Sequence, residues 1–263
     1  VDADVANALP TVNGRTRIEM DAAVGNLALG ANQSIASITS IAGQASTINL
    51  GANTLTIGFG SGQNTDGTAN ANFAGVISGT GSIIKDDTST QIFSGNNTYT
   101  GTTSVNAGIL IAGSTNALGA VAGSTTVASG ASLLIANGIA VGAEPLNING
   151  AGTAGAPGAL TQALNGSSSF AGPITVQTAS TISTNGVGTL TLTGGIDKTN
   201  VVLTLNGGGT ITINTAGISG NNDNLFNDDL IVDAATTVNL NVANTYEGPT
   251  FIRNGSTVNA NVA

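Results

Sequence analysis

Apolar and polar residues alternate with a period of two in short segments along most of this chain. The alternating residues are Leu27 and Leu29, Ile48 and Leu50, Leu55 and Ile57, Val105 with Ile109 and Ile111, Leu190 and Leu192, Val202 to Leu205, and Leu240 with Val242. This period predicts β-strands that bury one face. Glycine, asparagine, aspartate and serine separate the segments, as is typical of bends that need positive φ. No long segment shows a helical period, so the pattern predicts an all-β chain.

The chain also repeats itself. Residues 97–112 align without a gap with residues 244–259. An aromatic residue stands two positions before a glycine at Phe73/Gly75, Tyr99/Gly101, Phe170/Gly172 and Tyr246/Gly248. The spacing of these pairs fits a unit of roughly 21 to 26 residues. With such a unit, we expect Thr189 and Thr191 to lie over or under Thr210 and Thr212.

The length of the unit distinguishes between all-β architectures. Hairpins of a sandwich repeat at about 8 to 12 residues, whereas a coil of two or three strands with its bends needs about twice that. The sequence therefore predicts a single-domain parallel β-helix, a solenoid of about 10 to 12 coils. Residues 1–21 hold six of the 19 charged residues, and we expect them to form an N-terminal cap or docking segment. Residues 22–263 then form the β-helix with its degenerate repeats.

Composition limits both the core and the partners. With 38 glycines, no tryptophan and 3% aromatic residues, the chain can fill only a narrow aliphatic core. A net charge of −9 opposes binding to nucleic acid and to anionic membrane surfaces. The chain has no cysteine and no histidine, which excludes disulfides, thiolate metal sites and the usual serine–histidine or cysteine–histidine nucleophile pairs.

Carboxylates remain as candidate chemistry. Asp86/Asp87 and Asp228/Asp229 are adjacent pairs, but neighbours in a strand point to opposite faces and form no acid–base pair by themselves. We therefore expect no catalytic residue and no enzyme. Residues 221–233 concentrate oxygen ligands, and the weak candidates for calcium are Asp223, Asp228, Asp229 and Asp233. Their spacing matches neither an EF-hand nor the glycine-rich nonapeptide calcium repeat, so a solvated loop without a cofactor is the preferred interpretation.

Residues 77–113 closely resemble the passenger-associated strand repeat of bacterial autotransporters. The matching residues are Gly79, Gly81, Lys85, Gly95, Asn97, Tyr99, Gly101, Thr103, Gly108 and Leu110. The resemblance implies a right-handed parallel β-helix that is extracellular or at the bacterial cell surface. It identifies the chain as a mature passenger after signal removal or as a free secreted relative.

In such a fold, a tyrosine or phenylalanine before a glycine bend is expected to fill the widest corner of the coil or to cover the turn beneath it. The glycine is expected to admit the close approach. A platform of exposed rings that stacks sugars is the alternative. For the whole chain, the first hypothesis is a structural, adhesive protein whose copies associate head to tail in a surface filament. The residues expected at the junction are Val5, Leu9, Ile252 and Val258.

Two other functions stay open. One is a monomeric passenger adhesin that binds host or surface glycans or proteins. The other, less favoured, is a β-helix enzyme that acts on polysaccharides. Neither nucleic acid binding nor membrane insertion by this chain is expected.

Overall fold

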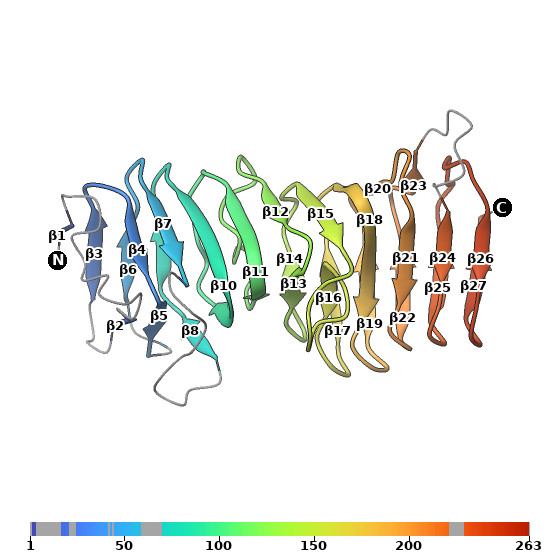
Figure 1. Cartoon of the computed structure of the whole chain (residues 1–263), viewed down its shortest axis with the longest axis horizontal. Helices are drawn as coiled ribbons and strands as arrows, with labels where there is room; N and C mark the ends of the chain where they lie inside the picture. Colours follow the sequence, from blue (N-terminus) through green and yellow to red (C-terminus); the bar gives the residue numbers. More distant parts are fainter. Residues whose placement is uncertain are drawn as a thin grey trace. The chain divides into compact units, whose positions relative to one another are not determined.

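The computed structural model describes residues 2–3, 17–20, 25–41, 43, 45–58, 70–220 and 229–262. The chain divides into two compact units, Val1–Thr126 and Val127–Ala263, and each is described by itself. Within the described residues all regular elements are strands, and together they form a parallel β-solenoid of about 10 turns. The predicted fold class is thus confirmed, and the repeated strands can be followed along each unit in Figure 1.

The strands of the first unit form three walls. They are β1 (Asp2–Ala3), β2 (Arg17–Met20), β3 (Asn26–Leu29), β4 (Gln33–Ile35), β5 (Ser37–Ser40), β6 (Thr47–Asn49), β7 (Thr54–Ile57), β8 (Ala71–Phe73), β9 (Val76–Ser78), β10 (Ser82–Phe93) and β11 (Thr103–Ala112). One wall runs β1-β3-β6-β9, a second runs β4-β7-β10-β11 with β8 also paired to β10, and the third is β2-β5. β12 (Thr125–Val127) contains the boundary between the units.

Columns of apolar side chains form the core of this unit. Leu27, Ile48 and Ile77 are in register on three successive strands, and all three are buried. Phe73 is likewise in register with Phe93, and neither side chain is exposed to solvent. Such columns arise because parallel pairing places equivalent residues of neighbouring turns about 4.8 Å apart.

The second unit has two long walls. Its strands are β13 (Ala131–Ile135), β14 (Ala140–Val141), β15 (Leu146–Gly150), β16 (Leu160–Gln162), β17 (Ser167–Phe170), β18 (Ile174–Thr184), β19 (Thr189–Leu192), β20 (Ile196–Asp197), β21 (Leu203–Asn206), β22 (Thr210–Ile213), β23 (Ile218–Ser219), β24 (Leu230–Val232), β25 (Thr237–Leu240), β26 (Thr250–Ile252) and β27 (Thr257–Ala260). One wall runs β14-β17-β19-β22-β25-β27 and another runs β15-β18-β21-β24-β26. β13-β16-β18 and β18-β20-β23 add shorter rows.

The predicted threonine stacking is confirmed in this unit. Thr189 pairs with Thr210 and Thr191 with Thr212, while the buried column beside them contains Leu190 and Ile211. Alternate positions of one strand therefore supply the core and the outer surface.

The turns differ in length more than the sequence predicts. Thr237 pairs with Thr257 across a short turn, whereas Thr47 pairs with Val76 across a turn that is almost half as long again. The strands on both sides of the longer turn stay in register, so the difference in length does not interrupt the wall. The predicted length of the unit lies between these two observed lengths.

In β11 the predicted alternation is wrong after its midpoint. Val105 is buried, but the next buried residues of the alternation are Leu110 and Ala112, while Ile109 and Ile111 are half-exposed. The cause is a register shift, since Lys85 pairs with Val105 but Asp86 pairs with Ala107. One additional residue in a strand moves every later side chain to the opposite face.

The predicted cap at residues 1–21 is described only at residues 2–3 and 17–20. These residues form β1 and β2, which pair in parallel with β3 and β5. The rest of that segment lies outside the described residues. No helix with the length and apolar character needed to span a bilayer occurs in the part of the chain that the structure describes.

Candidate functional site

A buried ion pair lies at the bulge between β10 and β11. The Lys85 side chain is 1% exposed, and its ammonium group contacts the Asp87 carboxylate. Lys85 Nζ also donates to the Asp87 carbonyl at 2.5 Å and to the Ala107 carbonyl at 3.4 Å. Burial lowers the pKa of Lys85, and the neighbouring carboxylates of Asp87 and Asp86 oppose that shift.

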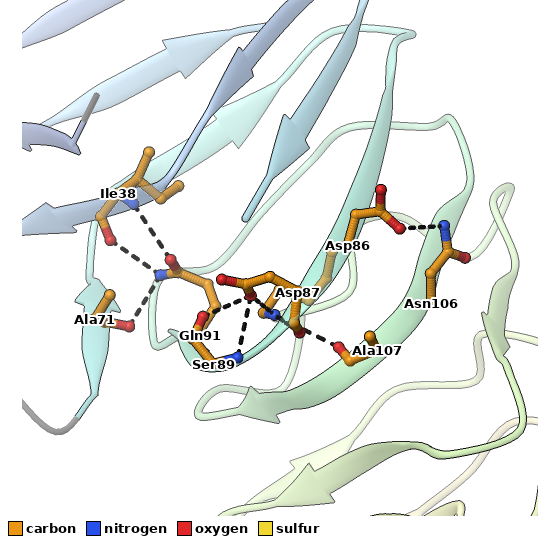
Figure 2. A network of polar contacts seen from close by, with 9 residues as sticks. Ile38, Ala71, Asp86, Asp87, Ser89, Gln91, Asn106 and Ala107 are labelled. Carbon is orange, nitrogen blue, oxygen red and sulfur yellow. Dashed lines mark hydrogen bonds and ion pairs between the residues drawn. The ribbon is translucent and has the colours of Figure 1, made fainter. Parts of the chain in front are cut away.

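Hydrogen bonds from Ser89, two residues further along β10, hold the Asp87 carboxylate in place. Its Oδ1 accepts hydrogen bonds from the Ser89 N–H at 3.2 Å and from the Ser89 hydroxyl at 2.6 Å. Asp86 points to the other face of β10, where it accepts from Asn106 at 3.1 Å. The two adjacent carboxylates are therefore separated by the strand, as the sequence predicts, and Figure 2 shows their divergence.

Gly108 makes this bulge possible. Its φ is +66°, and a Cβ at this position would lie 2.4 Å from the carbonyl oxygens of both Asp87 and Ser89. A side chain cannot fit there, because real Cβ contacts are longer and positive φ is strained for other residues. The bulge, its ion pair and Gly108 thus form one structural unit.

Gln91 forms a second polar cluster nearby, also drawn in Figure 2. Its amide nitrogen donates to the carbonyls of Ile38 at 3.0 Å and Ala71 at 2.9 Å, and its oxygen accepts from the Ile38 N–H at 3.2 Å. The side chain is 1% exposed. Gln91 therefore joins the main chains of β5 and β8 from inside the coil, where unpaired backbone groups are costly.

A tyrosine corner occurs once in each unit. Tyr99 is fully buried, and its hydroxyl hydrogen-bonds the Thr103 hydroxyl at 2.6 Å. Tyr246 repeats this contact with Thr250 at 2.7 Å, and its ring is partly exposed. Both rings are mostly buried and bound to a threonine four residues on, which supports the corner-filling role over an exposed sugar platform.

The phenylalanines of the same sequence spacing occupy different positions. Phe73 and Phe170 end wall strands β8 and β17, and Phe170 is in register with Leu192. At Phe73/Gly75 and Phe170/Gly172 the aromatic residue therefore lies on a wall strand and not at a corner. The four aromatics divide into two wall residues and two corner residues. Phe93 also stands two positions before a glycine, Gly95, and it is a further wall residue at the end of β10. The sequence analysis did not include this pair.

The glycines of these pairs are of two kinds, and most of them admit the close approach that the sequence predicts. Gly248 has the positive φ expected at a bend, +93°, but Gly75 lies outside the left-handed region. A Cβ at Gly75 would lie 2.3 Å from the Ser46 carbonyl oxygen and 2.6 Å from the Phe73 ring. Gly75 is therefore required by the close approach of the preceding turn, not by its backbone angle.

Gly101 and Gly172 follow the pattern of Gly75. A Cβ at Gly101 would lie 2.2 Å from the Gly81 carbonyl oxygen, and one at Gly172 would lie 1.8 Å from the Glu144 carbonyl oxygen. At each of these bends the main chains of two turns approach so closely that a side chain is excluded.

Ile252 and Val258 lie on the outermost strands of the second unit. Ile252 is 53% exposed, although it is in register with Val232, which is completely buried. Val258 is half-exposed and is in register with the buried Val238. The other two residues predicted at a junction, Val5 and Leu9, lie outside the described residues.

The calcium candidates are only partly described. Asp223 and Asp228 lie outside the described residues. The carboxylate of Asp233 accepts from the Ala234 N–H and from Asn254, both at 2.6 Å, and these bonds lower its pKa. Asp229 is half-exposed next to β24. Among the described residues no three acidic, histidine or cysteine side chains gather as metal ligands would.

The structure adds a cation that sequence reasoning did not single out. Lys198 is 1% exposed, and its Nζ lies 5.4 Å from the centre of the Tyr246 ring. A lysine within about 6 Å of an aromatic face is attracted by the ring quadrupole. Lys198 therefore supports the Tyr246 corner from the preceding turn.

A neutral polar face covers the outer side of one wall in the second unit. It consists of Ser167, Ser169, Thr189, Thr191, Thr210, Thr212, Thr237, Asn239, Thr257 and Asn259. Asn259 donates to Asn239 at 2.8 Å, and Asn239 donates to Thr212 at 3.4 Å. These bonds link the turns along the face, and none of its side chains is charged.

Comparison with known proteins gives one family match. The model of the Passenger-associated-transport-repeat matches residues 83–112 and 235–259. The first segment contains the bulge and Tyr99, and the second contains Tyr246. No curated protein and no solved structure matches the chain. The chain thus carries two passenger-associated transport repeats on a β-solenoid, as an autotransporter passenger does, and the repeats suggest an extracellular or surface location.

Proposed function

We propose that this chain is a non-catalytic, extracellular structural and adhesive protein whose copies join end to end in a surface fibre. The passenger-associated repeats support the location, and a solenoid of parallel turns is suited to a structural role. The observation that carries the proposal is the pair of passenger-associated repeats on a solenoid of parallel turns. In the proposed fibre, a turn of the next copy stacks on β26 and β27, the last described turn of the second unit.

The exposure of this turn is large compared with the turn before it. Ile252 is 53% exposed, whereas Val232, its register partner on β24, is completely buried. A further turn stacked on β26 and β27 would bury Ile252 and Val258 in the same way. Burial of apolar surface contributes about 25 cal/mol per Å², so the exposed face favours an added layer.

The main chain of β27 is also ready for pairing. Thr257 and Asn261 donate their N–H groups to Thr236 and Leu240 of the preceding turn. Donors alternate sides along a strand in a parallel ladder, so the N–H of Val258 faces away from β25. An open edge of this kind binds another strand by β-augmentation. If the start of a second copy binds there, the contact is heterologous and propagates as a fibre.

The test uses the full 263-residue chain. Electron microscopy and light scattering over a concentration series should show filaments. Ile252→Asp places a charge in the new core, and Val258→Pro removes an outward N–H without breaking a bond to β25, so both should abolish filaments. Deletion of residues 1–14 should have the same effect.

The matched control is Val187→Asp. Val187 is 79% exposed in the same unit, so the variant carries the same added charge away from the terminal turn and should still assemble. Wild-type protein that stays monodisperse at the highest concentration, without filaments, contradicts the fibre.

A monomeric passenger adhesin is the second candidate, and a groove in the second unit favours it. Gly195, Gly217 and Ala243 line this groove, Asp197 and Ser219 also contribute to it, and its volume is about 450 Å³. A neutral glycan strand fits such a surface better than an anionic one, because Asp197 is the charged group in its lining. Binding of the monomeric chain to arrayed neutral glycans, and loss of binding in Thr175→Trp, whose exposed side chain lines the groove, is the test.

A further inference from the structure

One wall of the second unit, β14-β17-β19-β22-β25-β27, keeps a single register throughout. Each of its pairings is continuous, whereas the pairing of β15 with β18 on the neighbouring wall contains a register shift after Ile148. Because no residue is inserted, every second side chain of these strands points outward. The outward side chains therefore form straight columns that cross the turns, and the strands that carry them follow one another in Figure 1.

The neutral polar face consists of two of these columns, one from Ser167 to Thr257 and one from Ser169 to Asn259. A third column lies beside them, directly after the strands. Its members donate their N–H groups to carbonyls of the preceding turn at 2.8 to 3.1 Å, and they are Thr193, Asn214, Asn241 and Asn261. Each of these turns thus presents three hydroxyl or amide groups in a row.

The polar atoms of the columns are held in place. Threonine is β-branched and therefore restricted at χ1, which limits the positions of a hydroxyl such as that of the partly exposed Thr191. The asparagines are fixed by bonds between turns, since Asn259 donates to Asn239 and Asn261 donates to Asn241, both at 2.8 Å. The array is therefore organised before any partner binds, which lowers the entropy lost on binding.

The spacing of the columns has the dimensions of a water lattice. Neighbouring turns are about 4.8 Å apart, and outward residues of one strand are about 6.6 Å apart. On its prism faces, ice exposes oxygen atoms in a rectangular lattice with two repeats of similar size. Each outward hydroxyl or amide group binds water, so the first water layer over the face follows these repeats. A growing ice surface needs little rearrangement to incorporate such a layer.

The composition of the face disfavours other classes of partner. The described strands of this wall carry no charged residue, so the face does not attract ionic partners. The outward residues of these strands include no aromatic ring, and binding surfaces for proteins and for nucleic acids depend on such rings. A neutral surface that orders water with a regular repeat remains.

We propose that the neutral polar face and the third column beside it bind a prism face of ice. The turns of β19, β22 and β25 carry the proposal, because each of them has a described neighbour on both sides. Ice that grows between adsorbed molecules must curve, and curvature lowers its freezing temperature below its melting temperature. This activity is separate from the proposed fibre and does not depend on it.

The test uses the full 263-residue chain. Thermal hysteresis, the difference between the melting and freezing temperatures of a single ice crystal, is measured over a concentration series. The fraction of the chain that enters a slowly growing ice hemisphere is measured in parallel, with serum albumin as the reference protein. The wild type should show hysteresis and should be enriched in ice relative to albumin.

One charge at the centre of the array should remove both effects. Thr191→Lys introduces it in the middle column, where the ammonium group orders water around itself and blocks the approach of ice. Thr204→Lys is the matched control. Thr204 is also partly exposed, but it lies on β21 of the other wall, so this variant should retain full hysteresis. Thr210→Lys replaces Thr191→Lys if circular dichroism shows that the latter does not fold.

Hysteresis that is present in the wild type, lost in Thr191→Lys and kept in Thr204→Lys supports the proposal. A wild type without hysteresis that is excluded from ice overturns it, and so does an equal loss in the two lysine variants. Binding of the wild type to crystalline cellulose without enrichment in ice also overturns it, in favour of a neutral polysaccharide.

Discussion

Tyr99 shows how much one aromatic side chain can contribute to a narrow core. Its ring is completely buried, and its hydroxyl is bound to the buried Thr103 hydroxyl. Tyr99→Ala should lower the free energy of unfolding by about 3 to 5 kcal/mol, because it removes the ring and leaves a cavity. Tyr99→Phe should cost about 1 to 3 kcal/mol, because it leaves the Thr103 hydroxyl without this partner.

Urea unfolding measures both losses. Tyr246→Ala is the control, because the Tyr246 ring is partly exposed and its loss should destabilise the chain less. An unchanged midpoint for Tyr99→Ala would contradict the corner-filling role.

The buried Lys85 predicts a dependence of stability on pH. Burial lowers its pKa in the folded chain below the ordinary value of 10.5, so the unfolded chain binds this proton more tightly. Stability therefore rises with pH between the folded and the unfolded pKa. Below the folded pKa the lysine is charged in both states, and its contribution is constant.

Comparison with Lys85→Met isolates this contribution. The free energy of unfolding of the wild type minus that of the variant should increase as the pH approaches 10.5 from neutrality. Parallel curves for the two proteins over this interval would show that Lys85 does not titrate differently on folding.

At the scale of elements, the bulge in β10 and β11 determines which residues of the wall are buried. Gly108→Ala should lower the free energy of unfolding by about 1 to 3 kcal/mol or more, since it combines a positive φ with a close backbone contact. Gly130→Ala is the matched control. Its φ is +84° and no atom lies within 4 Å of its Cβ position, so the loss there should be smaller.

Thermal unfolding of the two variants gives the comparison. Equal losses would show that the close contacts of Gly108 with Asp87 and Ser89 do not restrict the strand.

The same bulge explains which features the sequence predicts and which it does not. Alternation locates the strands and the core columns, because one buried face per strand imposes a period of two. It assigns Ile109 and Ile111 to the wrong face, because the inserted residue depends on pairing with β10 and not on local composition. Gln91 is missed for a related reason, since its partners, the main chains of β5 and β8, come from distant segments.

The tyrosine corners are easier to predict because their partners are close in sequence. Thr103 and Thr250 follow the tyrosines by four residues, so the pair repeats as a motif. Residues 116–120 cover the Tyr99 corner from the next turn. They have no fixed spacing from Tyr99 in the repeat, so only their hydrogen bonds to Asn97 and Tyr99 identify them as its partners.

At the scale of the whole molecule, the sequence predicts a single domain, and a single domain unfolds as one cooperative unit. A single domain should give one calorimetric transition with equal calorimetric and van't Hoff enthalpies. Two transitions, of which Tyr99→Ala lowers only one, would show that Val1–Thr126 and Val127–Ala263 unfold independently.

The variable length of the turns has a consequence for how such a gene can change. Pairing registers continue from turn to turn although the turn from Thr47 to Val76 is much longer than the turn from Thr237 to Thr257. In a solenoid each repeat depends mainly on its neighbours. Unequal recombination between two repeats would therefore add or delete whole turns without shifting the register of the others. Alleles of different lengths can then arise in single steps, each differing by a whole number of turns.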